Sequence, residues 1–329
     1  MKLAVIGAGA WGTGLSIALS GRHRVTLWAR RPEVRQALRV DRENRRLLPG
    51  HRFPDALMIG EELEGAVVDA DLLIVATPLS GLRPTVRRLR DDGLLRPLIW
   101  LCKGLEAETG KLPHQVVAEE IGQDTPYGAL SGPSFAEEVA SGLPAAVALA
   151  ASDPGFGHRT ALALHSSRLR IYANDDLVGV EVGGGVKNIM AIATGICDGL
   201  GLGLNARAAL ITRGLAEITR FGVALGAHSQ TFMGLAGIGD LILTCTGDLS
   251  RNRRVGLALG AGRTLPQILD ELGHVAEGVG TTREVARLSL AIGVDMPITQ
   301  AVDAILSHGE PSALAVEKLL SRDPKVEAS

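Results

Sequence analysis

Short apolar runs recur through the first half of the chain and predict a buried sheet. They lie at residues 1–6, 71–76, 98–101, 127–130 and 145–150. Continuous apolar runs of this length are typical of parallel strands that are covered on both faces. Helical stretches separate most of the runs, so the pattern predicts an α/β fold with an open, doubly wound, mostly parallel sheet.

The pattern changes near residue 180. Beyond it the strand signals fade, and residues 183–321 predict a set of helices joined by glycine-rich segments. Hydrophobic residues make up 46% of the 329-residue chain, which is enough for two cores. We therefore expect a sheet domain over residues 1–180 and an all-helical C-terminal domain over residues 181–329.

The first apolar run leads directly into the sequence GAGAWG at residues 7–12, and a second apolar stretch follows. A strand, a G-x-G-x-x-G turn and a helix start, in this order, are what a Rossmann-like dinucleotide site requires. Gly7 permits the tight turn, Gly9 lets the backbone approach a pyrophosphate, and Gly12 lets the helix pack against the strand. The free N–H groups at the helix start favour phosphate.

A secretory signal peptide is the alternative interpretation of this N-terminal segment. Lys2, the apolar run and the sequence ALS at residues 18–20 resemble one superficially. Glycines interrupt the apolar run, however, and a second strand follows at once at Arg24–Trp28. The dinucleotide turn is therefore the favoured interpretation.

The residues after the second strand indicate which cofactor the chain prefers. A fold that selects NAD usually places an acidic residue there, on the ribose 2′-OH. Here the strand is followed by Arg30 and Arg31, and the nearest acid is Glu33. Paired guanidinium groups suit a 2′-phosphate, so we expect NADPH as the preferred cofactor and NADH as the other candidate. The alternative is a solvated arginine pair that opens a helix at Pro32.

The composition argues against several classes of protein. The formal net charge is −2 and the basic residues are scattered, so we expect no nucleic-acid partner. The longest apolar stretch, residues 186–200, includes Lys187 and Asp198 and is interpreted as a buried helix rather than a membrane span. Three cysteines without C-x-x-C spacing fit a reducing cytoplasm. The eight histidines form no metal-ligand pattern, so we expect no metal.

Polar residues gather just after the predicted strands. These positions are residues 7–12, Arg30, residues 77–78, Lys103 and residues 131–134. In a doubly wound sheet, ligands bind at the carboxyl ends of the strands. We therefore expect the site at this edge of the sheet.

Lys187 is the candidate acid/base. It lies in the sequence GGGVKN, which we place at the start of the first helix after the domain boundary. Burial on an apolar helix disfavours the charged form of lysine and lowers its pKa toward neutrality, as a general acid/base requires. Arginine does not deprotonate and is unsuited to this role. The alternative is a structural lysine that snorkels or forms a salt bridge.

Three further polar islands interrupt the helical half, at residues 205–207, 239–240 and 250–254. The last, with the sequence SRNRR, combines a hydroxyl, an amide and guanidinium groups and resembles a cradle for an anion. A solvated basic helix start is the alternative interpretation. Asp240 follows the sequence GIG, so capping of the next helix is the alternative to a place in the site.

An ordered series of motifs runs along the whole chain. It comprises GAGAWGT at 7–13, CKGLE at 102–106, LSGPSFA at 130–136, VKN at 186–188, NARAAL at 205–210, GLAGIGD at 234–240, SRN at 250–252 and VAEG at 275–278. With this series the chain closely resembles the bacterial NAD(P)-dependent glycerol-3-phosphate dehydrogenases from end to end. The resemblance implies hydride transfer at C2 between sn-glycerol 3-phosphate and dihydroxyacetone phosphate, which supplies glycerol phosphate for phospholipid synthesis.

The resemblance also implies roles for individual residues, with Lys187 as the catalytic acid/base on the C2 oxygen. The implied substrate contacts are Lys103, Gly132, Ser134, Lys187, Asp240, Ser250, Arg251 and Asn252. The cofactor contacts, which include the glycine turn, are Gly7, Gly9, Ala10, Trp11, Gly12, Arg30, Arg31, Lys103, Ala136, Arg251, Val275 and Glu277. The family typically has tyrosine where this chain has Leu47, so we assign no cofactor contact there.

Two other functions fit parts of the sequence. A reductase of another small carbonyl substrate, of the β-hydroxyacid or ketopantoate type, needs a carboxylate clamp, whereas residues 250–252 with Lys103 favour phosphate. A catalytically silent dinucleotide sensor requires the glycine turn but not Lys187. The expected partner is thus a small phosphorylated three-carbon substrate, without stable membrane insertion. The apolar helical half allows a homodimer but does not require one.

Overall fold

The first half of the chain forms one sheet of eight strands in the computed structural model, which describes residues 1–122, 124–272 and 276–322. The strands are β1 (Lys2–Ile6), β2 (Arg24–Trp28), β5 (Met58–Ile59), β6 (Leu72–Val75), β7 (Leu98–Trp100), β8 (Tyr127–Ser131), β9 (Ala145–Ala151) and β10 (Leu169–Asn174). Their order is β10-β9-β8-β7-β6-β1-β2-β5, and every neighbouring pair is parallel except β8 and β9. The predicted doubly wound, mostly parallel sheet is confirmed.

Helices cover both faces of this sheet, and its central strands β6 and β7 are buried and apolar throughout. They are α1 (Ala10–Ser20), α2 (Pro32–Asp41), α3 (Leu63–Val67), α4 (Leu82–Asp91), α5 (Pro113–Ile121), α6 (Ala136–Ala140) and α7 (Pro154–Leu164). Along β1, Leu3 and Val5 pack with side chains of α1 and α7. Ala4 and Ile6 point to the opposite face and pack with α3, α4 and α5. The period of two along the strand therefore separates two cores, one on each face.

A two-stranded hairpin lies outside the sheet. Its strands, β3 (Glu43–Asn44) and β4 (Leu48–Arg52), pair antiparallel directly after α2. The buried side chain of Asn44 donates hydrogen bonds to the carbonyl oxygen of Ala8 at 3.0 Å and to Oγ1 of Thr13 at 2.9 Å. These bonds hold the hairpin against the glycine turn and the start of α1.

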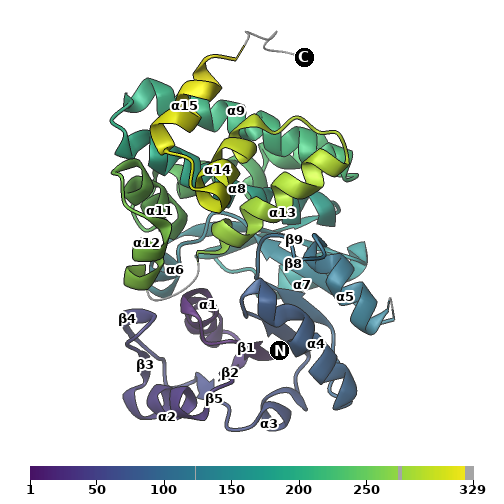
Figure 1. Cartoon of the computed structure of the whole chain (residues 1–329). Coiled ribbons are helices and arrows are strands. Elements are labelled where there is room, and N and C mark those ends of the chain that lie inside the picture. Colours follow the sequence, from purple (N-terminus) through teal and green to yellow (C-terminus); the bar gives the residue numbers. More distant parts are fainter. Residues whose placement is uncertain (123, 273–275, 323–329) are drawn as a thin grey trace.

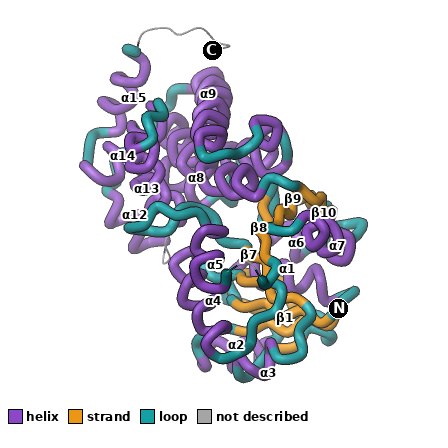
Figure 2. Tube along the Cα trace, turned by 90° about the vertical axis from the view of Figure 1, so that its right-hand side faces the viewer, coloured by secondary structure: helices purple, strands orange, loops and turns teal. Residues whose placement is uncertain are grey.

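The second half of the chain is helical over the residues that the structure describes. Its helices are α8 (Leu177–Gly199), α9 (Gly203–Ala224), α10 (Asp240–Thr246), α11 (Arg251–Gly260), α12 (Leu265–Leu272), α13 (Glu277–Ala291), α14 (Pro297–His308) and α15 (Ser312–Leu320), with single-turn segments at Ser229–Met233 and Leu235–Gly239 before α10. This half lies above the sheet in Figure 1, and the turned view in Figure 2 shows all strands gathered in the other half.

Helix α8 forms the centre of the helical half, and α9, α10, α11, α13 and α14 pack around it. Its N-terminus is capped by Asp176, whose Oδ1 accepts the N–H of Gly179 at 2.8 Å. The predicted buried helix is confirmed, but the prediction that Lys187 lies at its start is wrong, because the cap places the first turn at Leu177. Residue 180 falls in that first turn, and the division of the chain there stays a prediction.

The packing of α8 is unusually close at its C-terminal end. Gly195 and Gly199 on α8 face Gly256 and Gly260 on α11, and a Cβ at any of the four would meet the backbone of the other helix at 2.0–2.6 Å. By length and composition α8 is the one helix among the described residues that passes as a membrane span, yet 89% of its most apolar stretch is buried in the protein. Such burial is typical of a core helix.

Candidate functional site

The glycine turn has the geometry that a dinucleotide site requires. Gly7 has φ +122°, and a Cβ there would lie 2.5 Å from the carbonyl oxygen of Ala76. A Cβ on Gly12 would lie 2.2 Å from the carbonyl oxygen of Gly7, so only glycine lets α1 start against this turn. Gly9 directly precedes α1, and Ala10 and Trp11 form its first turn. The turn therefore presents backbone N–H groups at a helix N-terminus, where phosphate binds.

A cavity of about 810 Å³ opens beside this turn. Its walls include residues 7–9, the Arg30-Arg31 pair that follows β2, and Thr77 at the end of β6. Leu47 of the hairpin, to which we assigned no contact, also lines it. Both the size of the cavity and its place at the carboxyl ends of the strands fit a dinucleotide.

The two arginines at the rim of the cavity differ in their surroundings. Both are exposed, as expected for groups that bind a phosphate from solvent. Nε of Arg31 lies 3.6 Å from a carboxylate oxygen of Glu33, whereas Arg30 forms no ion pair within the described ranges. The guanidinium of Arg30 is therefore available to bind an anion without first breaking an ion pair.

A second cluster lies deeper, where three elements converge on one carboxylate. Asp240 is the first residue of α10, and it is 1% exposed. Its Oδ2 accepts a hydrogen bond from Nζ of Lys103, which follows β7, at 2.6 Å. Its Oδ1 accepts one from Nζ of Lys187, in the middle of α8. The side chain does not cap α10, so the capping interpretation of Asp240 is wrong.

Thr244 belongs to this cluster although the sequence did not single it out. Its Oγ1 lies 2.7 Å from Nζ of Lys187 and 2.6 Å from the carbonyl oxygen of Asp240, one turn earlier on α10. The i+4 spacing from Asp240 is the signal that would have identified it. A carboxylate and a hydroxyl therefore fix the Lys187 ammonium group on two sides.

Burial and neighbouring charge tune the ionisation of the cluster. Burial lowers the pKa of Lys187 to about 8; Lys103 acts in the same direction and Asp240 opposes it. Burial alone would raise the pKa of Asp240, but the two lysines hold it below its usual value. Two cations share one anion, so the protonated cluster has a net positive charge. It suits an anionic substrate, and a lysine with this pKa is able to transfer a proton near neutral pH.

The predicted anion cradle lies at the N-terminus of α11. Oγ of Ser250 accepts the N–H of Arg253 at 3.2 Å and caps the helix. Oδ1 of Asn252 accepts the N–H of Gly278 at 3.2 Å, which joins α11 to the start of α13. The guanidinium of Arg253 is used in ion pairs, whereas that of Arg251 is exposed. The basic run is thus partly structural, and its first three residues remain the candidates for an anion site.

The remaining predicted site residues that the structure describes lie after β8, at the start of α6 and at the start of α13. Gly132 has φ +143° and follows β8, and its carbonyl oxygen accepts a hydrogen bond from Oγ of Ser134 at 3.0 Å. Ala136 starts α6, which packs on α1. Burial raises the pKa of Glu277, and the charges of Arg251, Lys103 and Lys187 oppose this rise. Val275 lies outside the described residues.

The polar island at residues 205–207 takes a different place. Nε of Arg207 donates to Oδ1 of Asp198 at 2.7 Å, and the other oxygen of Asp198 binds Arg253. This island therefore joins α9 to the end of α8 and to α11, and it is not brought to the lysine cluster.

Comparison with known proteins decides the family. Models described as the N-terminus and the C-terminus of NAD-dependent glycerol-3-phosphate dehydrogenase match residues 2–156 and 176–317. The chain is 64% identical over 327 residues to glycerol-3-phosphate dehydrogenase [NAD(P)+] of Dechloromonas aromatica, with 99% of each chain covered. The chain belongs to the glycerol-3-phosphate dehydrogenase family.

Other members of the glycerol-3-phosphate dehydrogenase family agree with this assignment. The enzyme of Nitrosospira multiformis is 57% identical over 331 residues, with 99% of each chain covered. The crystal structure of glycerol-3-phosphate dehydrogenase from Coxiella burnetii matches with a TM-score of 0.92 at 41% identity, over 97% of this chain and 98% of that one. The chain is therefore an NAD(P)-dependent oxidoreductase, and a reductase of the ketopantoate type is not favoured.

Proposed function

We propose that this chain interconverts dihydroxyacetone phosphate and sn-glycerol 3-phosphate with Lys187 as the acid/base, and that it prefers NADPH. The observation that supports this most directly is the buried cluster in which Lys103 and Lys187 share Asp240. In a cytoplasmic setting the product would serve phospholipid synthesis. A small phosphorylated substrate is the expected partner, and homodimers are compatible with the proposal.

The sheet half would hold the cofactor. The glycine turn and the start of α1, with Ala10 and Trp11, would bind the pyrophosphate, and Arg30 and Arg31 would bind the adenosine phosphate. The other proposed cofactor contacts are Lys103, Ala136, Arg251, Val275 and Glu277. When bound, the nicotinamide supplies the hydride that is exchanged with C2 of the substrate.

The helical half would hold the substrate. The N-terminus of α11, with Ser250, Arg251 and Asn252, would bind its phosphate, because N–H groups and a guanidinium meet there. Lys103, Asp240, Gly132 and Ser134 would place C2 next to Lys187. Anchoring both ends of a three-carbon molecule in this way contributes several kcal/mol to catalysis.

Lys187 would move the proton. In reduction its ammonium group donates a proton to the oxygen on C2 as negative charge develops there, and in oxidation the neutral amine accepts that proton. Asp240 and Thr244 hold Nζ in place through both steps. The depressed pKa of about 8 makes both protonation states accessible near neutral pH.

The test is a Lys187→Met variant assayed with dihydroxyacetone phosphate and NADPH at 340 nm. We expect kcat to fall by about 10³-fold, since positioned acid/base groups contribute about 10²–10⁴-fold. The Kd for NADPH, measured by quenching of tryptophan fluorescence, should change less than twofold. Lys318→Met, at a lysine that is 63% exposed on α15, is the matched control and should retain full activity.

Two results would contradict this proposal. One is a Lys187→Met enzyme that keeps more than a tenth of kcat. The other is a wild-type enzyme that reduces 2-oxo acids or ketopantoate faster than dihydroxyacetone phosphate. That result would mean that residues 250–252 do not bind a substrate phosphate.

A further inference from the structure

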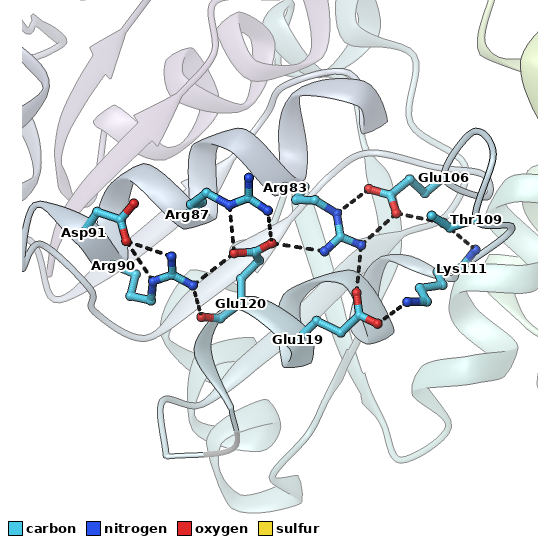
Figure 3. A network of polar contacts seen from close by, with 9 residues as sticks. All are labelled: Arg83, Arg87, Arg90, Asp91, Glu106, Thr109, Lys111, Glu119 and Glu120. Atoms are coloured by element: carbon cyan, nitrogen blue, oxygen red, sulfur yellow. Dashed lines mark hydrogen bonds and ion pairs between the residues drawn. The ribbon is translucent and has the colours of Figure 1, made fainter.

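Arg83 lies outside the proposed substrate and cofactor contacts, yet it connects both regions. It is the second residue of α4, a helix that starts directly after the Thr77–Gly81 segment at the edge of the cofactor cavity. Its side chain reaches toward the carboxylates of α5 and of the loop at residues 101–112 that leads from β7 to α5 (Figure 3). That loop includes Lys103.

The guanidinium of Arg83 is surrounded by three carboxylates. Nε and Nη2 donate to the two oxygens of Glu106, each at 2.7 Å, in a bidentate pair. Nη2 also donates to Glu119 at 2.8 Å, and Nη1 donates to Glu120 at 3.0 Å (Figure 3). The side chains of Arg83 and Glu106 are only 21% and 15% exposed. Planar, bidentate pairs that are largely shielded from water fix geometry better than exposed ion pairs do.

Glu106 is also the residue that closes the loop on itself. Its N–H donates to the carbonyl oxygen of Lys111, and its own carbonyl oxygen accepts the N–H of Gly110, both at 2.8 Å. Oγ1 of Thr109 donates to its carboxylate at 2.7 Å. The segment from 106 to 111 therefore forms a compact unit, and Arg83 attaches this unit to α4.

Little freedom separates this unit from Lys103. Gly104 has φ +110°, and a Cβ there would lie 2.2 Å from Oγ1 of Thr281 on α13. Leu105 is buried in the core of the helical half. Glu106 and Lys103 are therefore joined by two residues that are themselves packed in place.

The other side of the loop is held by the helical half. Oε1 of Glu284 on α13 accepts the N–H of Glu108 at 3.2 Å, and Nη2 of Arg287 donates to the carbonyl oxygen of Glu108 at 3.3 Å. Glu108 has φ +70°, a strained conformation for a residue with a Cβ. The loop is thus attached to α4 on one side and to α13 on the other.

We propose that Arg83 is a positioning residue for the reaction: by binding Glu106 it holds the loop in the conformation that keeps Lys103 on Asp240. The inference rests on the proposed assignment of Lys103 to the substrate. Without Arg83 the loop would keep its bonds to α13 and the ion pair of Lys111 with Glu119 on α5, but Glu106 would lose its bidentate partner and Lys103 would sample positions away from Asp240.

The test compares Arg83→Met with Arg87→Met in the full-length enzyme. Arg87 lies one turn further along α4 and binds Glu120 through Nη2 at 2.8 Å; in the described structure it does not reach Glu106. Both variants lose an ion pair to Glu120, and Arg83→Met also loses those to Glu106 and Glu119, so the Tm of each variant is measured beside its kinetics. We expect Arg83→Met to lower kcat/KM for dihydroxyacetone phosphate by about tenfold or more, since small misplacements cost up to about 10²-fold. KM for NADPH should change less than twofold, and Arg87→Met should resemble the wild type.

A second measurement without substrate keeps the inference falsifiable. Hydrogen–deuterium exchange at the amides of residues 104–111 should be faster in Arg83→Met and unchanged in Arg87→Met. Glu106→Gln should reproduce the kinetic defect, and the double variant should be no worse than either single variant. Arg83→Lys should restore part of the activity. If Arg83→Met does not fold, Arg83→Lys and Glu106→Gln carry the same comparison.

The outcomes separate this inference from the proposed function. Equal kinetics and equal exchange in Arg83→Met and Arg87→Met would overturn the positioning role. A Lys103→Met variant should be impaired at least as strongly as Arg83→Met. If Lys103→Met is fully active, the assignment of Lys103 itself is wrong; if it is impaired while Arg83→Met is not, only the role of Arg83 is wrong.

Discussion

The two halves of the molecule use glycine for different kinds of close approach. In the sheet half, Gly7 and Gly12 lie five residues apart and shape one turn. In the helical half, Gly195 on α8 and Gly256 on α11 are about sixty residues apart in the chain, yet each would clash with the other helix if it had a Cβ. The first pair forms a motif that can be recognised within one short segment. The second depends on a helix crossing, which no local pattern reveals.

The charged groups of the two halves differ in the same way. Arg30 and Arg31 are exposed at the rim of the cavity, where water screens each charge. Lys187 and Asp240 are 6% and 1% exposed, so their interaction is strong and shifts their ionisation. Substitutions in the helical half should therefore have larger effects than those at the rim.

The largest effect is expected from Gly195→Ala. The new methyl group would lie 2.1 Å from the carbonyl oxygen of Arg253, so α8 and α11 must separate. Overpacking of this kind costs about 1–3 kcal/mol or more, and here the backbone itself is in the way. Thermal denaturation followed by circular dichroism should show a clear drop in Tm.

The control for this variant is Gly280→Ala in α13. Among the described residues nothing lies within 4 Å of a Cβ at that position, and the residue is helical. Ala is favoured over Gly in a helix by about 0.5–1 kcal/mol, so Tm should stay or rise. A Gly195→Ala protein as stable as the wild type would mean that the helix crossing tolerates expansion.

The pH dependence of the reaction tests whether the buried lysine is the acid/base. Reduction needs the protonated amine, so kcat/KM should fall about tenfold per pH unit above the pKa of about 8. Oxidation needs the neutral amine, so its kcat/KM should rise up to about pH 8 and then level off. Asp240→Asn removes a carboxylate that raises the pKa of Lys187, so the pH profiles of both reactions should shift to lower pH. Profiles that do not shift in Asp240→Asn would indicate that a different group titrates.

The contrast between the halves also explains how far the sequence could predict the structure. The strands and the glycine turn follow from short segments, because burial on both faces and phosphate binding impose local patterns. The exact place of Lys187 within α8 did not follow, because the start of that helix depends on Asp176, which also accepts a hydrogen bond from Thr231 at 2.6 Å across the fold.

Partners of charged side chains were the least predictable feature. The sequence SRNRR predicts an anion cradle of a hydroxyl, an amide and guanidinium groups, yet the guanidinium of Arg253 binds Asp198 at 2.8 Å and Asp248 at 3.0 Å. The role of Arg83 shows the same limit, since Glu106 lies 23 positions away. An ion pair of this kind forms only once the helices have packed, and no spacing in the chain encodes it.

The smallest effect is expected at the exposed rim, where Arg30→Gln and Arg31→Gln test the choice of cofactor. Arg30 forms no ion pair in the described part of the chain, whereas Arg31 lies 3.6 Å from Glu33 and must leave it to meet a phosphate. We expect Arg30→Gln to raise KM for NADPH by about tenfold, since a charge-assisted hydrogen bond is worth about 1.5–3 kcal/mol before screening by water. Arg31→Gln should raise it less, and KM for NADH should change less than twofold in both. An unchanged ratio of the two KM values in Arg30→Gln would show that the rim does not select the 2′-phosphate, and the preference would then have to come from elsewhere in the cavity.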